Sequence, residues 1–357
     1  MFKSILKLPY ALLIIVAVLI VGCLDEIEFD LPAENQDSLV IQGRLVKGDP
    51  HQISVQVERL FDFNGSSASI RVSYVRITND LGQTIDLDNV SLGTYAKNIP
   101  VNDPNFDIQT GGSFKATIET LDDRKYESTF EVLHPVPKVE EVKTRIVQRE
   151  VPVTQGTELR DRVQFLLSTP LTVPGEEDRA RINWQTTRTY KMTDIEAKTC
   201  YITDNVNVSE VKPFDGNVLD LDYLTDYELY ESNIGFQFRQ GMHLNIFQQS
   251  LSKGAFEYWD QIDKLLERNG NMFESPVGEI ISNFENVVTP NEDVFGYFYA
   301  TEIDTINVFV DSMFVNSPGN YCPPPLPPPP GGGCAVEICC NCLAAPVSTT
   351  VKPAYWE

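Results

Sequence analysis

The sequence feature that most limits the fold is a run of short segments, between residues 38 and 133, in which apolar and polar side chains alternate. The clearest of these segments are 39–46, 53–57, 70–77, 114–118 and 126–132. Successive side chains of a strand point to opposite faces, so a period of two predicts strands with one buried face. Asp122-Asp123-Arg124-Lys125 separates the last two segments and predicts a hairpin turn. We therefore expect an Ig-like antiparallel β-sandwich over residues 37–135.

A second β-rich domain is predicted over residues 138–320, after His134-Pro135-Val136-Pro137 interrupts the alternation. Its strand-like runs are 164–167, 180–185, 242–247 and 294–300. Residues 252–269 have helical spacing instead, with Ser252 as the expected N-cap. The apolar face of this helix comprises Ala255, Phe256, Trp259, Ile262 and Leu266. Such an aromatic stripe is typical of a helix that packs on a core, and a ligand platform is the alternative. The expected fold class is mainly β, with one amphipathic helix in the second domain.

The charge of the chain excludes some classes of partner. Its 357 residues include 51 acidic and 28 basic side chains, which give a formal net charge of -23. Like charges repel, so we expect no attraction to nucleic acid or to anionic lipid surfaces. The only histidines are His51, His134 and His243, which are far apart in the sequence. The chain therefore has too few histidines for most histidine-based catalytic triads and metal sites.

The N-terminus has the pattern of a secretory signal peptide, in which two lysines precede an apolar run over residues 8–21. The run is too short to be a stable membrane span. Gly22 directly precedes Cys23, and the aliphatic Ile20 lies three positions before the cysteine. This is the pattern of a bacterial lipobox. Residues 1–22 are thus predicted to be a lipoprotein signal peptide, and Cys23 the lipidated first residue of the mature chain. A plain secretory signal with a stray cysteine is the alternative.

Acidic residues follow this cysteine directly. Asp25, Glu26 and Glu28 lie in a tether over residues 23–36. Such a stretch resembles the export signal that carries lipoproteins of Bacteroidota to the outer face of the outer membrane. The alternative is an ordinary solvated tether in a chain that is acidic throughout. The predicted location is the outer membrane, with a lipid anchor and with the chain facing the cell surface.

Beyond the lipobox, the chain has six cysteines, an even number that suits three disulfides in an oxidising compartment. They are Cys200, Cys322, Cys334, Cys339, Cys340 and Cys342. A zinc site is the alternative, but only Cys339 and Cys342 have the spacing of one zinc-binding arm. Adjacent Cys339 and Cys340 can hardly bond to each other, so we expect each to reach another partner, with Cys200 as one candidate.

The last segment, residues 321–357, is a Pro/Gly/Cys-rich tail with little core of its own. Within it, residues 323–330 are all proline except Leu326, which predicts an extended polyproline helix. This helix is expected to be a stiff spacer, and recognition by an aromatic groove is the alternative. The disulfides would fasten the tail to the body of the protein.

Motifs along nearly the whole mature chain point to one family. They are the lipobox cysteine, the strand Lys125-Tyr126-Glu127-Ser128, the segments 252–259 and 296–300, the cysteine-rich tail and the terminal Lys352-Pro353-Ala354-Tyr355-Trp356. Their order resembles that of the domain-of-unknown-function family 4249, a family of Bacteroidota outer-membrane lipoproteins. The resemblance implies an extracellular accessory that works beside a TonB-dependent receptor. It brings no catalytic residues with it.

No catalytic motif is assembled in the sequence, which has no G-x-S-x-G elbow, no H-E-x-x-H and no phosphate loop. Acidic loops at 86–88, 102–107 and 220–222 lack the spacing of a calcium loop, so we expect solvated turns there and no cofactor. The expected function is that of a non-enzymatic accessory or binding subunit, which docks by its sandwich faces and loops on an outer-membrane barrel, a TonB-dependent receptor. The alternative is a surface-anchored degradative enzyme, such as a glycosidase that uses paired carboxylates.

Overall fold

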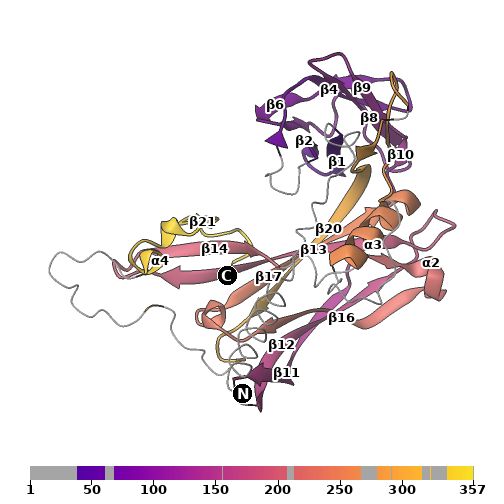
Figure 1. The fold of residues 1–357 in the computed structure, drawn as a ribbon. Helices are drawn as coiled ribbons and strands as arrows, with labels where there is room; N and C mark the ends of the chain where they lie inside the picture. The colour runs from indigo at the N-terminus through magenta and orange to yellow at the C-terminus, as the bar shows by residue number, and fades with distance from the viewer. Residues whose placement is uncertain are drawn as a thin grey trace, which may run out of the picture.

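The structure is a computed structural model that describes residues 38–60, 68–154, 156–206, 213–266, 280–290, 292–315, 322 and 336–356. These residues form a mainly β protein, as the sequence predicts. Figure 1 shows two lobes, a β-sandwich at one end and a longer, flatter body beneath it. We call them the sandwich and the second lobe.

The sandwich packs two sheets face to face around one core. One sheet contains β1 (Leu39–Lys47), β2 (His51–Arg59), β3 (Ala68–Ser69), β6 (Asp88–Ser91) and β7 (Thr94–Ile99). The other contains β4 (Val72–Asn79), β5 (Thr84–Asp86), β8 (Ser113–Thr120), β9 (Lys125–Ser128) and β10 (Glu131–Val132). Side chains from both sheets, such as Ile41 and Phe114, share the core. The predicted hairpin is confirmed, because β8 and β9 pair antiparallel across the turn that follows Thr120.

The sandwich is not one continuous piece of chain, and here the predicted division is wrong. Three strands from the predicted second domain complete the sandwich: β18 (Phe284–Asn286) pairs with β9, while β19 (Val294–Phe295) and the start of β20 (Phe298–Val310) pair with β1. The pairs with β1 are parallel, so the sandwich is not purely antiparallel either. The sequence pattern identifies a buried strand at 294–300, but a period of two carries no information about which sheet that strand joins.

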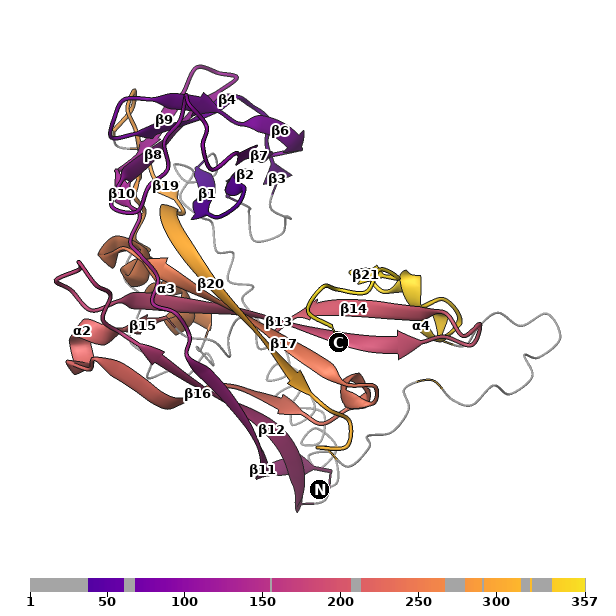
Figure 2. The same ribbon diagram turned by 180° about the vertical axis from the view of Figure 1, so that it is seen from behind.

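The second lobe also has two sheets with a core between them, to which Phe165 and Trp184 belong. Its main sheet contains β13 (Arg181–Thr193), β14 (Thr199–Asn205), β15 (Phe214–Asp215), β17 (Met242–Leu251), β21 (Ser348–Thr349) and the far part of β20. The other sheet contains β11 (Glu141–Val153), β12 (Gly156–Pro170) and β16 (Tyr223–Asn233). Strands β11 and β12 form a long hairpin whose tip lies at the end opposite the sandwich (Figure 2).

Strand β20 connects the two lobes. Its first residues pair with β1 and its last residues pair with β17, so one continuous sheet passes from the sandwich into the second lobe. The linker after β10 is fixed to this sheet by side chains. Gln248 Nε2 donates to the carbonyl of Pro137 at 2.6 Å, and Ser250 Oγ donates to the carbonyl of His134 at 2.6 Å. Hydrogen bonds of this kind satisfy the buried linker backbone and hold the lobes in one arrangement.

The helical elements are α2 (Gly216–Leu219), α3 (Lys253–Leu266), α4 (Glu337–Cys340) and the 3-10 turns η3 (Phe236–Phe238) and η4 (Cys342–Ala344). The amphipathic helix is confirmed as α3, with Ser252 Oγ accepting from the amide of Ala255 at 3.0 Å. Its predicted last turn, 267–269, lies outside the described residues. Ala255 is fully buried, whereas Trp259 is only half-buried and Leu266 is exposed. Among the described residues, no helix combines the length and the apolar composition that crossing a membrane requires.

The C-terminal tail is fastened to the second lobe by disulfides. Cys200 on β14 bonds to Cys342, and Cys322 bonds to Cys339. Cys340 is also disulfide-bonded, and Cys334 lies outside the described residues. The sequence suggested Cys200 as a partner for Cys339 or Cys340, but its partner is Cys342, since spacing alone does not determine connectivity. Residues 323–330 likewise lie outside the described residues.

Candidate ligand-binding cleft

A buried carboxylate organises the junction between the lobes. Glu131 on β10 accepts hydrogen bonds from Ser252 Oγ and, at 2.7 Å, from the hydroxyl of Tyr297. Ser252 caps α3, and Tyr297 lies between β19 and β20. Burial raises the pKa of Glu131, while the two hydroxyl donors act against this rise. One side chain therefore ties the sandwich, the helix and the shared strand together.

Two glycines allow these elements to approach so closely. A Cβ atom at Gly254, in the first turn of α3, would collide with the Tyr297 hydroxyl. Gly296 has a φ of +96°, and a Cβ atom there would collide with the carbonyl of Ile41 on β1. Only glycine accepts this combination of conformation and contact. The junction thus explains why two of the motifs quoted above contain glycine.

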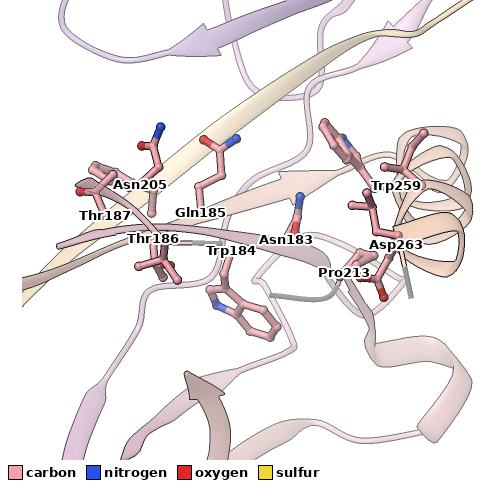
Figure 3. A pocket seen from close by; sticks show the side chains of 13 residues that line it. Asn183, Trp184, Gln185, Thr186, Thr187, Asn205, Pro213, Trp259 and Asp263 are labelled. Atoms are coloured by element: carbon pink, nitrogen blue, oxygen red, sulfur yellow. The ribbon is translucent and has the colours of Figure 1, made fainter. Parts of the chain in front are cut away.

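The first of two pockets lies between α3 and the main sheet of the second lobe. It has a volume of about 240 Å³. Its polar walls include Asn183 and Gln185 from β13 and Asn205 from β14, and α3 contributes Trp259 and Asp263. Figure 3 shows the carboxamides of Gln185 and Asn205 on one side of the sheet and the Trp184 ring on the other. We call this cavity the lower pocket.

The second pocket lies between α3 and the sandwich and has a volume of about 180 Å³. Arg44 and Gln56 of the sandwich line it, and Tyr297 and Tyr299 form its aromatic side. We call this cavity the upper pocket. Gln185 and Trp259 line both pockets, so the two adjoin, and we refer to them together as the cleft.

Aromatic rings fix the position of Trp259 in the cleft. The rings of Tyr258 and Tyr299 meet the indole at interplanar angles of 74° and 88°. Neither tyrosine is therefore stacked in parallel on the indole. Burial raises the pKa of Tyr258, Tyr297 and Tyr299, so their hydroxyls stay protonated at physiological pH and remain hydrogen-bond donors.

The cleft carries little charge. Among the described residues that line it, Arg44 is the one cation and Asp263 the one anion. Arg44 Nη1 donates to Gln185 Oε1 at 3.4 Å, which links the sandwich to β13 across the cleft. The rest of the lining is uncharged and combines amide, hydroxyl and aromatic side chains with aliphatic ones such as Val206, Ile262 and Leu266, in contrast to the net charge of -23 on the whole chain.

The residues predicted as sites from the sequence do not meet in this cleft. Cys23 and the tether acids Asp25, Glu26 and Glu28 lie outside the described residues. Two of the three acidic loops form ion pairs within the protein: Asp86 contacts Arg76 at 2.6 Å, and Asp222 contacts Arg179 at 3.0 Å. In the loop at 102–107, Asp103 accepts from the amide of Asn105 at 2.8 Å. Over the described part of the chain, no group of three or more His, Cys, Asp or Glu residues is placed to hold a metal ion.

Sequence reasoning missed most of the cleft. Arg44 and Gln185 belong to alternating strands and resemble ordinary exposed residues there. They meet only because the lobes fold together, across 141 residues of sequence. For Trp259 the sequence predicts a place on the helix core, with a ligand platform as the alternative. The structure packs it against the core cluster beneath α3 and also places it in the lining of both pockets.

The fold and the cleft define a β-rich, two-lobed protein with a polar and aromatic cavity at the junction. The family model described as Domain of unknown function (DUF4249) matches residues 24–307. The chain belongs to this family, as the motifs in the sequence indicated. The match covers the sandwich, the cleft and most of β20, and the cysteine tail follows it. No curated protein matches the chain.

Proposed function

We propose that the protein is a surface-exposed outer-membrane lipoprotein, and that it acts as a non-enzymatic accessory or binding subunit of an outer-membrane barrel, a TonB-dependent receptor. The observation that carries the proposal is the lipobox that ends at Cys23. A chain anchored there begins its first strand at Leu39. At about 3.3–3.6 Å per residue, the stretch from Cys23 to Leu39 spans at most roughly 60 Å, so the folded part stays close to the membrane.

Confinement to a membrane makes a modest interface sufficient. Two partners that share one membrane meet at a high effective concentration, so weak affinity in solution is compatible with stable association. The protein and a barrel in the same outer membrane fulfil this condition. No new contact beyond a small docking surface is then required.

The described surface offers a suitable docking patch at the end opposite the sandwich, which we propose in place of the sandwich faces and loops expected from the sequence. Leu159, in the β11–β12 hairpin, and Met313, just after β20, are 60% and 79% exposed, and Val153 and Phe314 are also exposed. The two segments lie together, because Val151 and Val315 line the same hollow. We call Val153, Leu159, Met313 and Phe314 the hairpin-end patch. The strand register places Leu159 and Val153 on opposite faces of the hairpin, so the exposed apolar side chains lie on both faces of this end of the lobe. Exposed apolar side chains that are concentrated at one end of a molecule are typical of an interaction surface.

The glycosidase alternative has weaker support. Retaining and inverting glycosidases need two carboxylates, about 5 to 9.5 Å apart, on either side of the bond that breaks. The described lining of the cleft contains one carboxylate, Asp263. Glu131 is committed to Ser252 and Tyr297 beneath the cleft. The aromatic walls therefore suit binding better than hydrolysis.

The test is affinity purification of the full-length lipoprotein from its own membranes in mild detergent, followed by identification of co-purifying chains. We expect a barrel to co-purify. The double variant L159D/M313D should lose it, because two buried charges in an apolar interface are costly. The control L81D/L121D changes two leucines on sandwich turns that are 67% and 68% exposed, and it should retain the barrel. Recovery of the protein alone in several mild detergents, together with turnover of a surface polymer, would favour the enzyme instead.

A further inference from the structure

We propose that the cleft binds a neutral oligosaccharide, with one sugar ring against Trp259 and its hydroxyls bonded to the carboxamides of β13 and β14. This inference deepens the proposed function by naming the class of cargo. Its test uses the purified protein without a barrel, so that failure of either idea can be recognised separately.

The polar lining matches the chemistry of sugar hydroxyls. Each hydroxyl is both a donor and an acceptor, and a carboxamide also offers both. Asn183, Gln185 and Asn205 place such groups around the lower pocket, and Gln42 and Gln56 do so in the upper pocket. Gln185 accepts from Arg44 through its oxygen, Oε1, so its Nε2 hydrogens can donate to a ligand.

The same face of the sheet holds buried polar atoms that have no bonding partner among the described residues. Asn245 Oδ1 is an acceptor and Gln249 Nε2 a donor, and both side chains are almost completely buried. They are the cross-strand neighbours of Thr187 and Asn183, which line the lower pocket. Directly opposed residues point to the same face, so these groups lie on the side of the sheet that faces the cleft. Neither side chain lines a pocket itself: Asn245 contacts Tyr355 of the tail, and Gln249 lies behind Tyr299 of the upper pocket. They add polar character to the sheet beneath the cleft, and the lining side chains themselves supply the groups that meet a ligand.

The aromatic side chains match the other face of a sugar. A pyranose ring has a face of C–H groups that packs on an aromatic ring, while its hydroxyls point outward from the ring edge. Trp259 lies where the two pockets meet, with no tyrosine stacked in parallel on its indole. The two volumes, about 240 and 180 Å³, together fall within the roughly 300–1,000 Å³ of ordinary ligand sites. The cleft therefore has room for more than one sugar unit.

Charge and topology disfavour other ligands. One cation and one anion line the described cleft, so the cleft has no excess of charge that would attract a polyanion or a polycation. A peptide is often recognised by adding a strand to a free sheet edge. Here β1 lies between β2 and β20, and β17 lies between β13 and β20, so their backbone groups are already bonded. Recognition must come from side chains, which favours a sugar over a peptide.

The experiment measures binding of the detergent-solubilised full chain to maltohexaose, cellohexaose, xylohexaose and mannohexaose by calorimetry, with tryptophan fluorescence as a second readout. Polygalacturonate and neutral hexapeptides complete the panel. We expect at least one neutral hexasaccharide to bind at millimolar concentration or below and to change the fluorescence. W259A should weaken binding at least tenfold. Q185A should weaken it roughly 2- to 12-fold, the net worth of one hydrogen bond.

The control is Q148A, which removes an exposed glutamine from β11, far from the cleft. It should bind like the parent protein. Gln185 has an exposed side chain, so Q185A keeps the proposal testable even if W259A fails to fold. Thermal unfolding of each variant checks that it is folded. Absence of binding to every neutral sugar, preference for the hexapeptides or for polygalacturonate, or binding that Q185A leaves unchanged would each overturn the proposal.

Discussion

Glu131 shows how much of the junction depends on single side chains. On β10 it is one of many acids in an acidic chain, yet it is 6% exposed and bonded to Ser252 and Tyr297. These partners are 121 and 166 residues away in sequence. The N-cap role of Ser252 could be predicted because a cap is a local feature. The role of Glu131 could not, because its partners come from elements that meet only in the folded protein.

The raised pKa of Glu131 predicts a pH dependence of stability. Its ordinary pKa in the unfolded chain is about 4.3. Because burial raises the folded-state pKa, the native state binds the proton more tightly, and this contribution is complete below the unfolded pKa. It is lost as the pH rises through the folded pKa. E131Q cannot ionise, so the difference in unfolding free energy between parent and E131Q should change across this window. Urea unfolding of both proteins at a series of pH values measures this difference in unfolding free energy. A difference that stays constant with pH would contradict the prediction.

E131A serves as the contrast to E131Q. Gln can still accept from one hydroxyl and donate to the other, but Ala leaves Ser252 and Tyr297 without their acceptor. A buried donor without a partner costs about 1–3 kcal/mol, so E131A should be clearly less stable than E131Q at any pH.

A second prediction concerns Gly254. Alanine is favoured over glycine inside helices by about 1 kcal/mol, so G254A would stabilise an isolated helix. Here the new Cβ meets the Tyr297 hydroxyl, and overpacking of this kind costs about 1–3 kcal/mol. We expect G254A to destabilise the protein, and to do so less in a Y297F background, which lacks that hydroxyl. A double-mutant cycle in urea measures the coupling, and simple additivity would show that the contact is unimportant.

Strand β20 shows what a sequence pattern leaves open for whole elements. Its apolar start belongs to the run 294–300, which predicts a buried strand, and the structure continues the strand to Val310. Its two halves, however, pair with β1 and β17, which come from different parts of the chain. Local periodicity reports the buried face of a strand and not its neighbours. The same limit explains why single strands such as β1 and β2 are predicted correctly and the division between the domains is not. Strands β11, β14 and β16 are absent from the prediction.

Removal of either disulfide of the tail should lower the stability of the protein by an amount that depends on the length of the loop it closes. Cys200–Cys342 closes a separation of 142 residues, and Cys322–Cys339 closes one of 17. A longer loop restricts the unfolded chain more, so C200S/C342S should cost more stability than C322S/C339S, within the roughly 2–5 kcal/mol typical of native disulfides. Trp356 packs against Tyr201 and His243, so the first variant should also expose the tail to limited proteolysis. Equal losses for both variants would argue against an effect of loop length.

At the level of the whole molecule, the cleft and the hairpin-end patch are separate surfaces. Helix α3, which lines the cleft, lies beneath the sandwich, and the β11–β12 hairpin, which carries part of the patch, lies at the opposite end of the second lobe (Figures 1 and 2). A protein built this way can hold a cargo at one place and a partner at another. The main sheet continues from one lobe to the other through β20, so a single sheet connects the regions that carry the two surfaces.

The last prediction concerns anchoring and orientation. The lipid on Cys23 should place the parent protein in the outer-membrane fraction, and protease added to intact cells should remove it. C23S cannot be lipidated and should leave the membrane fraction. The variant D25N/E26Q/E28Q keeps the lipobox but loses the acidic stretch. If that stretch is an export signal, this variant should stay in the membrane and become resistant to protease until the outer membrane is permeabilised. A matched variant, D122N/D123N, neutralises acids of a sandwich turn and should behave like the parent. Digestion of D25N/E26Q/E28Q on intact cells would identify the acids as an ordinary solvated tether. Resistance of the parent itself would show that the protein faces the periplasm, and the proposed surface location would have to be abandoned.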